Sequence, residues 1–181
     1  TRRSSDLLTN GTTYYYICRV TDDVAATDDS NEISATPSNT IVIVCEGNSL
    51  MAGTGSTGGN TVPGQLDALL GSQYVITNVA TGGARIADYE GRAATIDGYY
   101  DADAIDNYLL LWPSTNDLYD NRSAAAVAAD LEAYCLDRIA TGWKIYLFTE
   151  VDRSNSGTPS GFTTQRLLYN ETLRTTFQGF A

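Results

Sequence analysis

Ser49 is the residue of this sequence best placed to act as a nucleophile. It follows the β-branched run of residues 41–45, just past Gly47, where the strand pattern breaks. A hydroxyl in that position can attack an acyl carbon, but it is a weak nucleophile at neutral pH and needs a general base to remove its proton. The sequence contains no histidine. It therefore presents a candidate nucleophile without the most usual base.

The composition narrows the classes of partner. The chain has 181 residues, of which 43% are hydrophobic, enough for one domain or for a small domain and part of another. Eleven basic against 22 acidic residues give a net charge of −11, and Lys144 is the single lysine, so we expect no nucleic-acid partner. No apolar stretch approaches the roughly twenty residues of a membrane helix, so we expect no membrane partner.

Two further patterns are interpreted as structural. The cysteines Cys18, Cys45 and Cys135 are isolated, so we predict buried small side chains and no metal site. Residues 53–58 match the dinucleotide-binding pattern G-x-G-x-x-G, but seven residues separate the preceding strand from Gly53. The first glycine of a true fingerprint makes the turn directly after its strand, so we expect no cofactor.

The elements that would position Ser49 form an α/β pattern from residue 41 onward. Apolar strands are predicted at 41–45, 74–79, 107–112 and 143–149. Helical stretches are predicted between and after them, at 63–70, 86–100, 123–139 (with Ser123 as N-cap) and 163–177. Such alternation predicts a parallel sheet covered by helices, whose ligands bind beyond the carboxyl ends of the strands.

Residues 1–38 show a different, all-β pattern. Strands are predicted over residues 12–20 and 32–35, and the sequence of these segments resembles the last two strands of a fibronectin type III domain. Pro37 and the small polar residues after it predict a linker. We therefore expect a partial fibronectin-like domain at 1–38 and a second domain at 39–181. The chain also lacks an initiating methionine, and we expect it to be an internal piece of a longer protein.

Three segments of the second domain resemble, in order, the motifs of the SGNH/GDSL hydrolases. Residues 46–50, EGNSL, are similar to the first motif, G-D-S-L. Residues 78–84, NVATGGA, resemble the second, whose glycine falls on Gly83. Residues 112–118, WPSTNDL, resemble the third, G-x-N-D, whose asparagine falls on Asn116. The resemblance extends over residues 41–181.

The resemblance implies a fold and a chemistry. The fold would be a three-layer α/β/α sandwich with a parallel, flavodoxin-like sheet that lacks its last strand. The chemistry would be hydrolysis of acyl esters, in which Ser49 attacks the carbonyl. The oxyanion would be stabilised by the N–H of Ser49, the N–H of Gly83 and the side-chain amide of Asn116. Glycine suits the second of these positions because a side chain there would obstruct the substrate.

Each residue also has a purely structural interpretation. Ser49 would cap the helix after the first strand, and Asn116 would stabilise a turn through its own backbone. Two positions depart from the motifs. Asn48 stands in place of the aspartate beside the nucleophile, which would alter hydrogen bonds at the helix start. Ser114 replaces the glycine that opens the third motif, which would affect how Asn116 is aimed.

The largest departure is the absence of the final D-x-x-H motif, which supplies the base and its orienting carboxylate. We expect it beyond Ala181, after a fifth strand. Two hypotheses follow. The parent protein is an esterase, with O-acetyl groups of carbohydrates as the leading substrate and a small-molecule or glycan ester as partner. Alternatively, it is a non-catalytic carbohydrate-binding or adhesive module, such as a phage fibre or secreted adhesin. In either case we expect an extracellular or virion-associated location, and the sequence assigns no oligomeric state.

Overall fold

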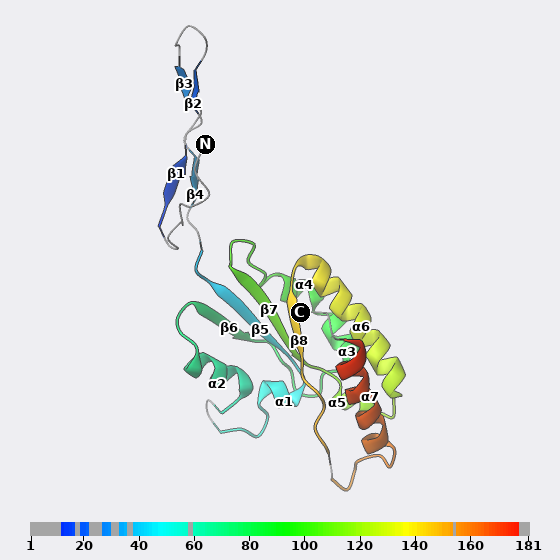
Figure 1. Cartoon of the computed structure of the whole chain (residues 1–181). Coiled ribbons are helices and arrows are strands. Elements are labelled where there is room, and N and C mark those ends of the chain that lie inside the picture. Colours follow the sequence, from blue (N-terminus) through cyan, green and yellow to red (C-terminus); the bar gives the residue numbers. More distant parts are fainter. Residues whose placement is uncertain are drawn as a thin grey trace.

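The computed structural model describes residues 12–16, 19–21, 27–29, 33–35, 38–57, 60–153 and 155–177. Its larger part is built on a four-stranded parallel sheet in the order β6-β5-β7-β8 (Figure 1). The strands are β5 (Ile41–Gly47), β6 (Tyr74–Asn78), β7 (Asp106–Trp112) and β8 (Lys144–Leu147). The predicted parallel α/β sheet is confirmed, and each strand lies within two residues of its predicted bounds.

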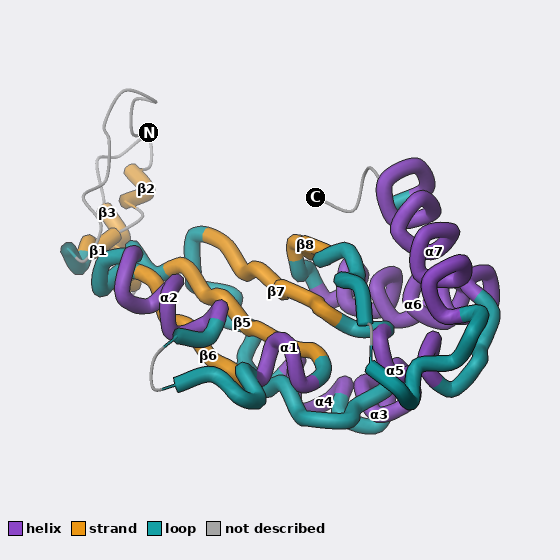
Figure 2. The backbone as a smooth tube through the Cα atoms, turned by 90° about the horizontal axis from the view of Figure 1, so that it is seen from below, coloured by secondary structure: helices purple, strands orange, loops and turns teal. Residues whose placement is uncertain are grey.

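Helices cover both faces of this sheet and make it the middle of three layers. They are α1 (Ser49–Ala52), α2 (Val62–Leu69), α3 (Ile86–Glu90), α4 (Ala93–Asp97), α5 (Thr115–Tyr119), α6 (Ala124–Thr141) and α7 (Phe162–Thr176). Figure 2 shows α1 and α2 beside β5 and β6, and the other helices on the opposite side of the sheet. Among the described residues, no helix is both long and apolar enough to cross a membrane.

Alternation along the strands divides the core between the two faces. Leu109 and Leu111 of β7 are fully buried against the α6 and α7 layer, together with Leu131 of α6. Tyr108 and Leu110 point to the other face and are only partly buried. That face is covered by α1 and α2 near β5 and β6, which leaves its β7 and β8 half open.

Local sequence explains where the helices begin and end. Ser123 caps α6 as predicted, because its Oγ accepts a hydrogen bond from the Ala126 N–H at 3.3 Å. The predicted helical stretch at 86–100 forms two short helices, since Gly91 ends α3 and Gly98 ends α4. A helix at α1 was expected only as the one that Ser49 would cap, and α5 was not predicted, because four or five residues are too few to show a helical period.

The described residues of the N-terminal part form four short strands in two antiparallel pairs. β1 (Tyr14–Tyr16) pairs with β4 (Ile33–Ala35), and β2 (Arg19–Thr21) pairs with β3 (Thr27–Asp29). The strand predicted over 12–20 thus corresponds to β1 and β2. The fibronectin-like interpretation and the domain boundary stay predictions, and Cys18 and Pro37 lie outside the described residues.

Cys45 and Cys135 are confirmed as buried, unpaired thiols. Burial raises the pKa of the Cys45 thiol to about 11 and that of Cys135 to about 12. Both side chains are therefore protonated at neutral pH and act as packing groups.

Candidate active site

Asn48 fixes the turn that presents Ser49 at the end of β5. Its Oδ1 accepts a hydrogen bond from the Leu50 N–H at 2.9 Å, and its Nδ2 donates to the Trp112 carbonyl oxygen at 2.9 Å. The cap of α1 is therefore Asn48, and the interpretation of Ser49 as the capping residue is wrong. An aspartate could accept the first bond but not donate the second, so the asparagine changes the hydrogen bonds at the helix start, as expected.

Gly47 lets β5 and β7 approach closely behind the nucleophile. A Cβ at this position would lie 2.6 Å from the Trp112 carbonyl oxygen and 2.9 Å from Met51 Cβ. The first of these atoms belongs to the backbone of the neighbouring strand, so it cannot move aside without disturbing the sheet. The glycine at this position is required by packing.

We expect Gly47→Ala to lower the free energy of unfolding by about 1–3 kcal/mol, because the added methyl overpacks two strands. Denaturant unfolding measures this loss. Gly71→Ala is the matched control, since a Cβ there meets no atom within 4 Å. An equal loss in both variants would contradict the packing argument.

The loop after β6 brings Gly83 to the same end of the sheet. The Thr81 N–H donates to the Gly47 carbonyl oxygen at 3.0 Å, which ties this loop to the nucleophile turn. The Cβ position of Gly82 lies 4.0 Å from Ser49 Cβ. Gly83 has φ of +82°, a conformation that favours glycine. This backbone conformation is a reason for glycine in addition to the predicted obstruction of the substrate by a side chain. The protein itself gives no steric reason, because none of its atoms lies within 4 Å of the Cβ position of Gly83.

Asn116 lies in α5, past the end of β7, and contacts the Gly83 loop. Its Nδ2 donates to the Ala84 carbonyl oxygen at 2.9 Å, so the interpretation in which it stabilises its own turn is wrong. The next residue adds a second link, because Asp117 accepts a hydrogen bond from the Ile86 N–H at 3.2 Å. The amide retains a second hydrogen for another acceptor.

Two backbone donors near Ser49 have no acceptor within the described part of the chain. They are the N–H groups of Ser49 and Gly83. Ser49 is the first residue of α1, where N–H groups have no partner inside the helix. With the free hydrogen of Asn116, the ends of three adjacent strands present three donors.

Two hollows lie beside these groups. One, of about 200 Å³, is lined by Ser49, Leu50, Thr115, Val151, Asp152 and Arg153. The other, of about 510 Å³, has glycine and alanine along much of its wall and is lined by Thr81, Gly82, Gly83, Ala84, Ala87, Asp88, Gly91 and Arg92. Ser49 therefore lines the first hollow and Gly83 lines the second.

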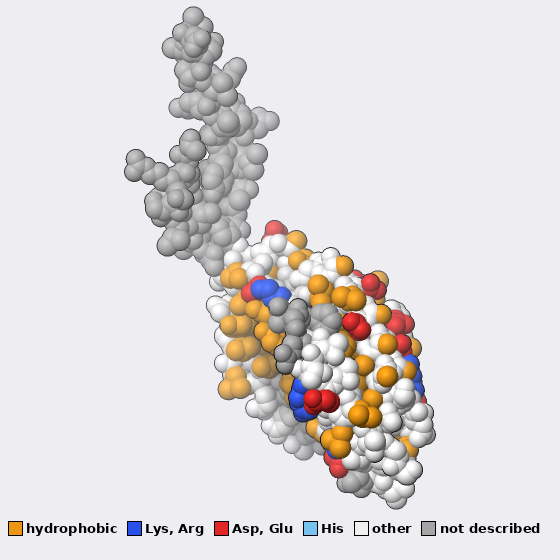
Figure 3. Space-filling view, turned by 45° about the vertical axis from the view of Figure 1, so that its right-hand side comes forward, with side chains coloured by type: hydrophobic (Ala, Val, Ile, Leu, Met, Phe, Trp, Pro, Cys, Tyr) orange, Lys and Arg blue, Asp and Glu red, His pale blue; other side chains and the backbone are white. Residues whose placement is uncertain are grey.

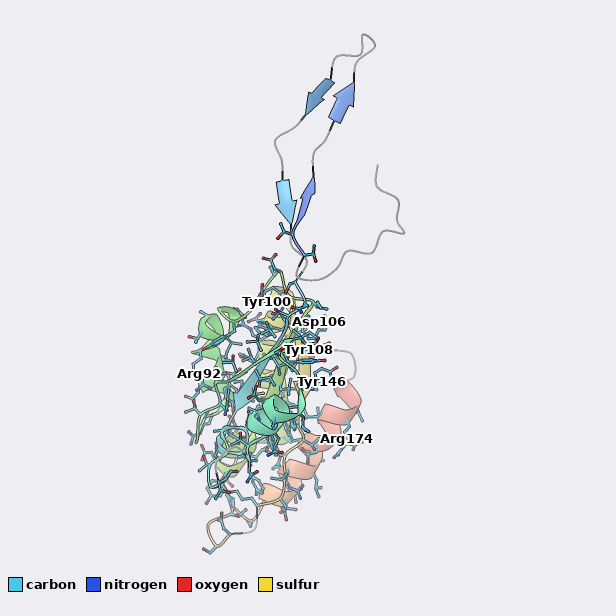
Figure 4. The ribbon with its side chains drawn as sticks, turned by 90° about the vertical axis from the view of Figure 1, so that its left-hand side faces the viewer. Arg92, Tyr100, Asp106, Tyr108, Tyr146 and Arg174 are labelled. Atoms are coloured by element: carbon cyan, nitrogen blue, oxygen red, sulfur yellow. The ribbon has the colours of Figure 1, made fainter. Side chains whose placement is uncertain are left out.

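The buried carboxyl group of Glu46 is connected through Arg92 to the loop that carries Gly83. Glu46 is fully buried at the end of β5, accepts a hydrogen bond from the Tyr134 hydroxyl at 2.5 Å and pairs with Arg92 at 3.4 Å. Burial raises the pKa of Glu46. Arg92, labelled in Figure 4, also donates to the Thr81 Oγ1 at 2.8 Å, so it connects the buried carboxylate to the Gly83 loop.

Glu150 is a second buried carboxylate, which the sequence reasoning missed. It follows β8, is 2% exposed, and its Oε1 accepts a hydrogen bond from the Ser114 N–H at 2.6 Å. Burial raises its pKa to about 7. The sequence did offer a signal for this residue, because Glu150 directly follows the predicted apolar strand at 143–149, as Glu46 directly follows the strand predicted at 41–45.

The serine at position 114 fits the turn without a glycine. Ser114 has φ of −110°, which any residue adopts, and its Oγ donates to the Tyr169 hydroxyl at 2.5 Å. The expected disturbance of Asn116 is therefore not supported by the backbone. Gly53, the first glycine of the dinucleotide-like pattern, ends α1 with φ of +80°. The described residues contain no cluster of metal-ligating side chains.

The structure of this chain is similar to solved structures of known proteins. No protein-family model and no curated protein matches the sequence. Solved structures do match: a member of the lipolytic protein G-D-S-L family from Veillonella parvula has 20% identity and a TM-score of 0.63 over 77% of this chain and 73% of that one. The chain has the SGNH hydrolase fold.

Two further structures with this fold extend the comparison. The SGNH-hydrolase family esterase AlinE4 has 19% identity and a TM-score of 0.61, covering 78% of this chain and 72% of that one. The acetyl xylan esterase AlAXEase has 16% identity and a TM-score of 0.55, covering 74% and 72%. The predicted fold class is thus confirmed, and Ser49, Gly83 and Asn116 lie at the carboxyl ends of β5, β6 and β7.

Proposed function

We propose that this chain is the nucleophile-bearing part of a serine ester hydrolase. The observation that carries the proposal is that Ser49, Gly83 and Asn116 follow the ends of three adjacent strands, where the Cβ position of Gly82 lies 4.0 Å from Ser49 Cβ and Asn116 donates to Ala84. Ser49 lines a hollow, and the neighbouring donors are unpaired by the described residues or only partly used. This arrangement suits attack on an acyl carbonyl.

In this mechanism Ser49 Oγ adds to the carbonyl carbon of an ester while a base removes its proton. Negative charge develops on the carbonyl oxygen. Donors fixed in advance stabilise that charge, each by about 3–4 kcal/mol. Here they would be the Ser49 N–H, the Gly83 N–H and the Asn116 Nδ2. Collapse of the intermediate expels the alcohol, and water then releases the acid from the acyl-serine.

The proposal places the base outside the 181 residues, which include no histidine. Two features support a further segment at β8. β8 is an edge strand with one side unpaired by the described residues. Beside it lies an apolar hollow of about 340 Å³, lined by Ile43, Tyr108, Leu110, Tyr146 and Phe148.

Parallel sheets are normally covered on both faces, so this half-open face is suited to an added strand and helix. Figure 4 shows Tyr108 and Tyr146 side by side on this face, and Figure 3 shows hydrophobic side chains gathered along one edge of the molecule. A fifth strand beside β8 would bring its own carboxyl end to the edge of the sheet where Ser49 lies.

Imidazole in solution can stand in for the absent base and so test the proposal. We expect imidazole to increase the hydrolysis of p-nitrophenyl acetate by the wild-type chain above the hydrolysis by Ser49→Ala at the same imidazole concentration. The variant corrects for hydrolysis by imidazole itself. Equal rates for a folded wild type and variant, at every imidazole concentration, would contradict the proposal.

The substrate class and the alternative function are separate questions. The acetyl xylan esterase among the similar structures favours O-acetyl groups of carbohydrates as substrate. The alternative is a non-catalytic carbohydrate-binding or adhesive module. That alternative predicts glycan binding that Ser49→Ala leaves unchanged and no imidazole effect.

A further inference from the structure

We infer that Glu150 is a positioning residue for Asn116, whose carboxylate holds the turn before α5 and so aims the amide at the Ser49 site. The inference rests on the proposed function for the role of Asn116. The contact itself is a property of the folded chain. It can therefore be tested without measuring catalysis.

Glu150 connects two walls of the hollow beside Ser49. Its Oε1 holds the Ser114 N–H, and Ser114 immediately precedes the helix that carries Asn116. Thr115, the next residue, lines the hollow from that side. The residues that follow Glu150, at 151–153, line the same hollow from the other side.

Glu150 is itself anchored firmly to α7. Its backbone N–H donates to Asn170 Oδ1 at 2.7 Å, and its carbonyl oxygen accepts from Asn170 Nδ2 at 2.8 Å. The carboxylate therefore extends from a fixed backbone. The turn before α5 is held against that fixed point, and Asn116 then reaches Ala84 across the site.

A carboxylate is a costly choice for a purely structural contact at this place. Glu150 is 2% exposed, and its Oε2 is buried without a hydrogen-bonding partner among the described residues. Burying an incompletely satisfied acid costs more than burying an amide or an apolar side chain of similar size. What the acid supplies is a stronger acceptor for the Ser114 N–H, because charged acceptors form the stronger hydrogen bonds.

The groups around Glu150 set the pKa of its carboxyl group, and so the pH at which this hydrogen-bond acceptor loses its charge. Ser114 and Thr115 favour the charged form of Glu150, whereas burial and Asp117 of α5 disfavour it. The phenols of Tyr89 on α3 and Tyr169 on α7 also interact with the carboxylate, and the pKa of each is raised, so both stay neutral. The resulting pKa of Glu150 is about 7, above its ordinary value of 4.5.

The sign of the pH effect follows from this direction. Below pH 7 Glu150 becomes protonated and its hold on the Ser114 N–H weakens. The folded chain binds this proton more tightly than the unfolded chain does, so the contribution of Glu150 to stability is greatest at low pH. It is lost as the pH rises through about 7. Stability and positioning therefore respond to this proton in opposite directions.

Nuclear magnetic resonance of the isotope-labelled chain tests the inference. We expect the Ser114 N–H and the Asn116 side-chain amide to shift with one common midpoint near pH 7, matching the Glu150 carboxyl carbon. Glu150→Gln should abolish both shifts between about pH 6 and 8. Glu132→Gln on the exposed side of α6 is the matched control and should keep them.

Two results would overturn the inference. One is a Glu150 carboxyl that titrates while the Asn116 amide does not respond; the other is an Asn116 response that persists in Glu150→Gln. If Glu150→Gln fails to fold, the wild-type titration decides by the first criterion. Failure of the proposed function would show instead as absence of any imidazole-dependent, Ser49-dependent hydrolysis, whatever these resonances do.

Discussion

Without added base, these 181 residues are expected to hydrolyse p-nitrophenyl acetate no faster than their Ser49→Ala variant. The chain contains no histidine, and a positioned general base typically contributes a factor of about 10²–10⁴ to such a reaction. The measurement is the initial rate at pH 7 to 8 for both proteins after equal purification. Circular dichroism on each confirms that the comparison is between folded chains.

A Ser49-dependent rate in the unassisted chain would contradict this expectation. It would mean that a carboxylate of the chain acts as the base, and burial raises the pKa of Glu150 to about 7, which suits that role. The pH profile would then rise with a midpoint near 7. Glu150→Gln would abolish the rate, whereas Glu132→Gln would not.

Asn116→Ala is expected to lower the imidazole-assisted rate by a factor of about 10²–10³, the typical effect of removing one oxyanion donor. The amide is expected to act through its second hydrogen, since the first is used by the Ala84 carbonyl oxygen. Asn116→Asp should be at least as damaging, because it keeps the shape but replaces a donor with a negative charge. The measurement is the rate above the Ser49→Ala background.

Asn39→Ala, at an exposed position in the segment before β5, provides the control and should leave the assisted rate unchanged. Denaturant unfolding of Asn116→Ala separates the two roles of the side chain. Loss of the Ala84 hydrogen bond is expected to lower stability by only about 1 kcal/mol. A rate unchanged in Asn116→Asp would show that the amide is not an oxyanion donor.

Much of the fold could be predicted from local pattern. The apolar runs that became β5, β6, β7 and β8 differ in period from the helical stretches between them, and that difference is a property of neighbouring residues. Ser123 was predictable as a cap for the same reason, since its partner lies three residues away. The short helix α5 escaped prediction because five residues are too few to show a period.

The candidate site was predictable only in part. Ser49, Gly83 and Asn116 could be chosen because each follows a strand, and parallel strands end at one edge of a sheet. The hydrogen bonds that hold the loops of these residues in place could not be predicted. The bond from Asn48 to Trp112 joins residues 64 positions apart, and that from Asn116 to Ala84 joins residues 32 apart.

The sequence by itself determined the alternation of strands and helices, the positions of three residues after strand ends, and the absence of a histidine base. These follow from residue types and spacings over a few positions. Only the tertiary structure decided that Asn48 donates to Trp112, that Gly47 must lack a side chain and that Glu150 is buried beside Ser114. Each of these depends on which atom of a distant segment lies opposite, and that is fixed only when the strands and helices pack together.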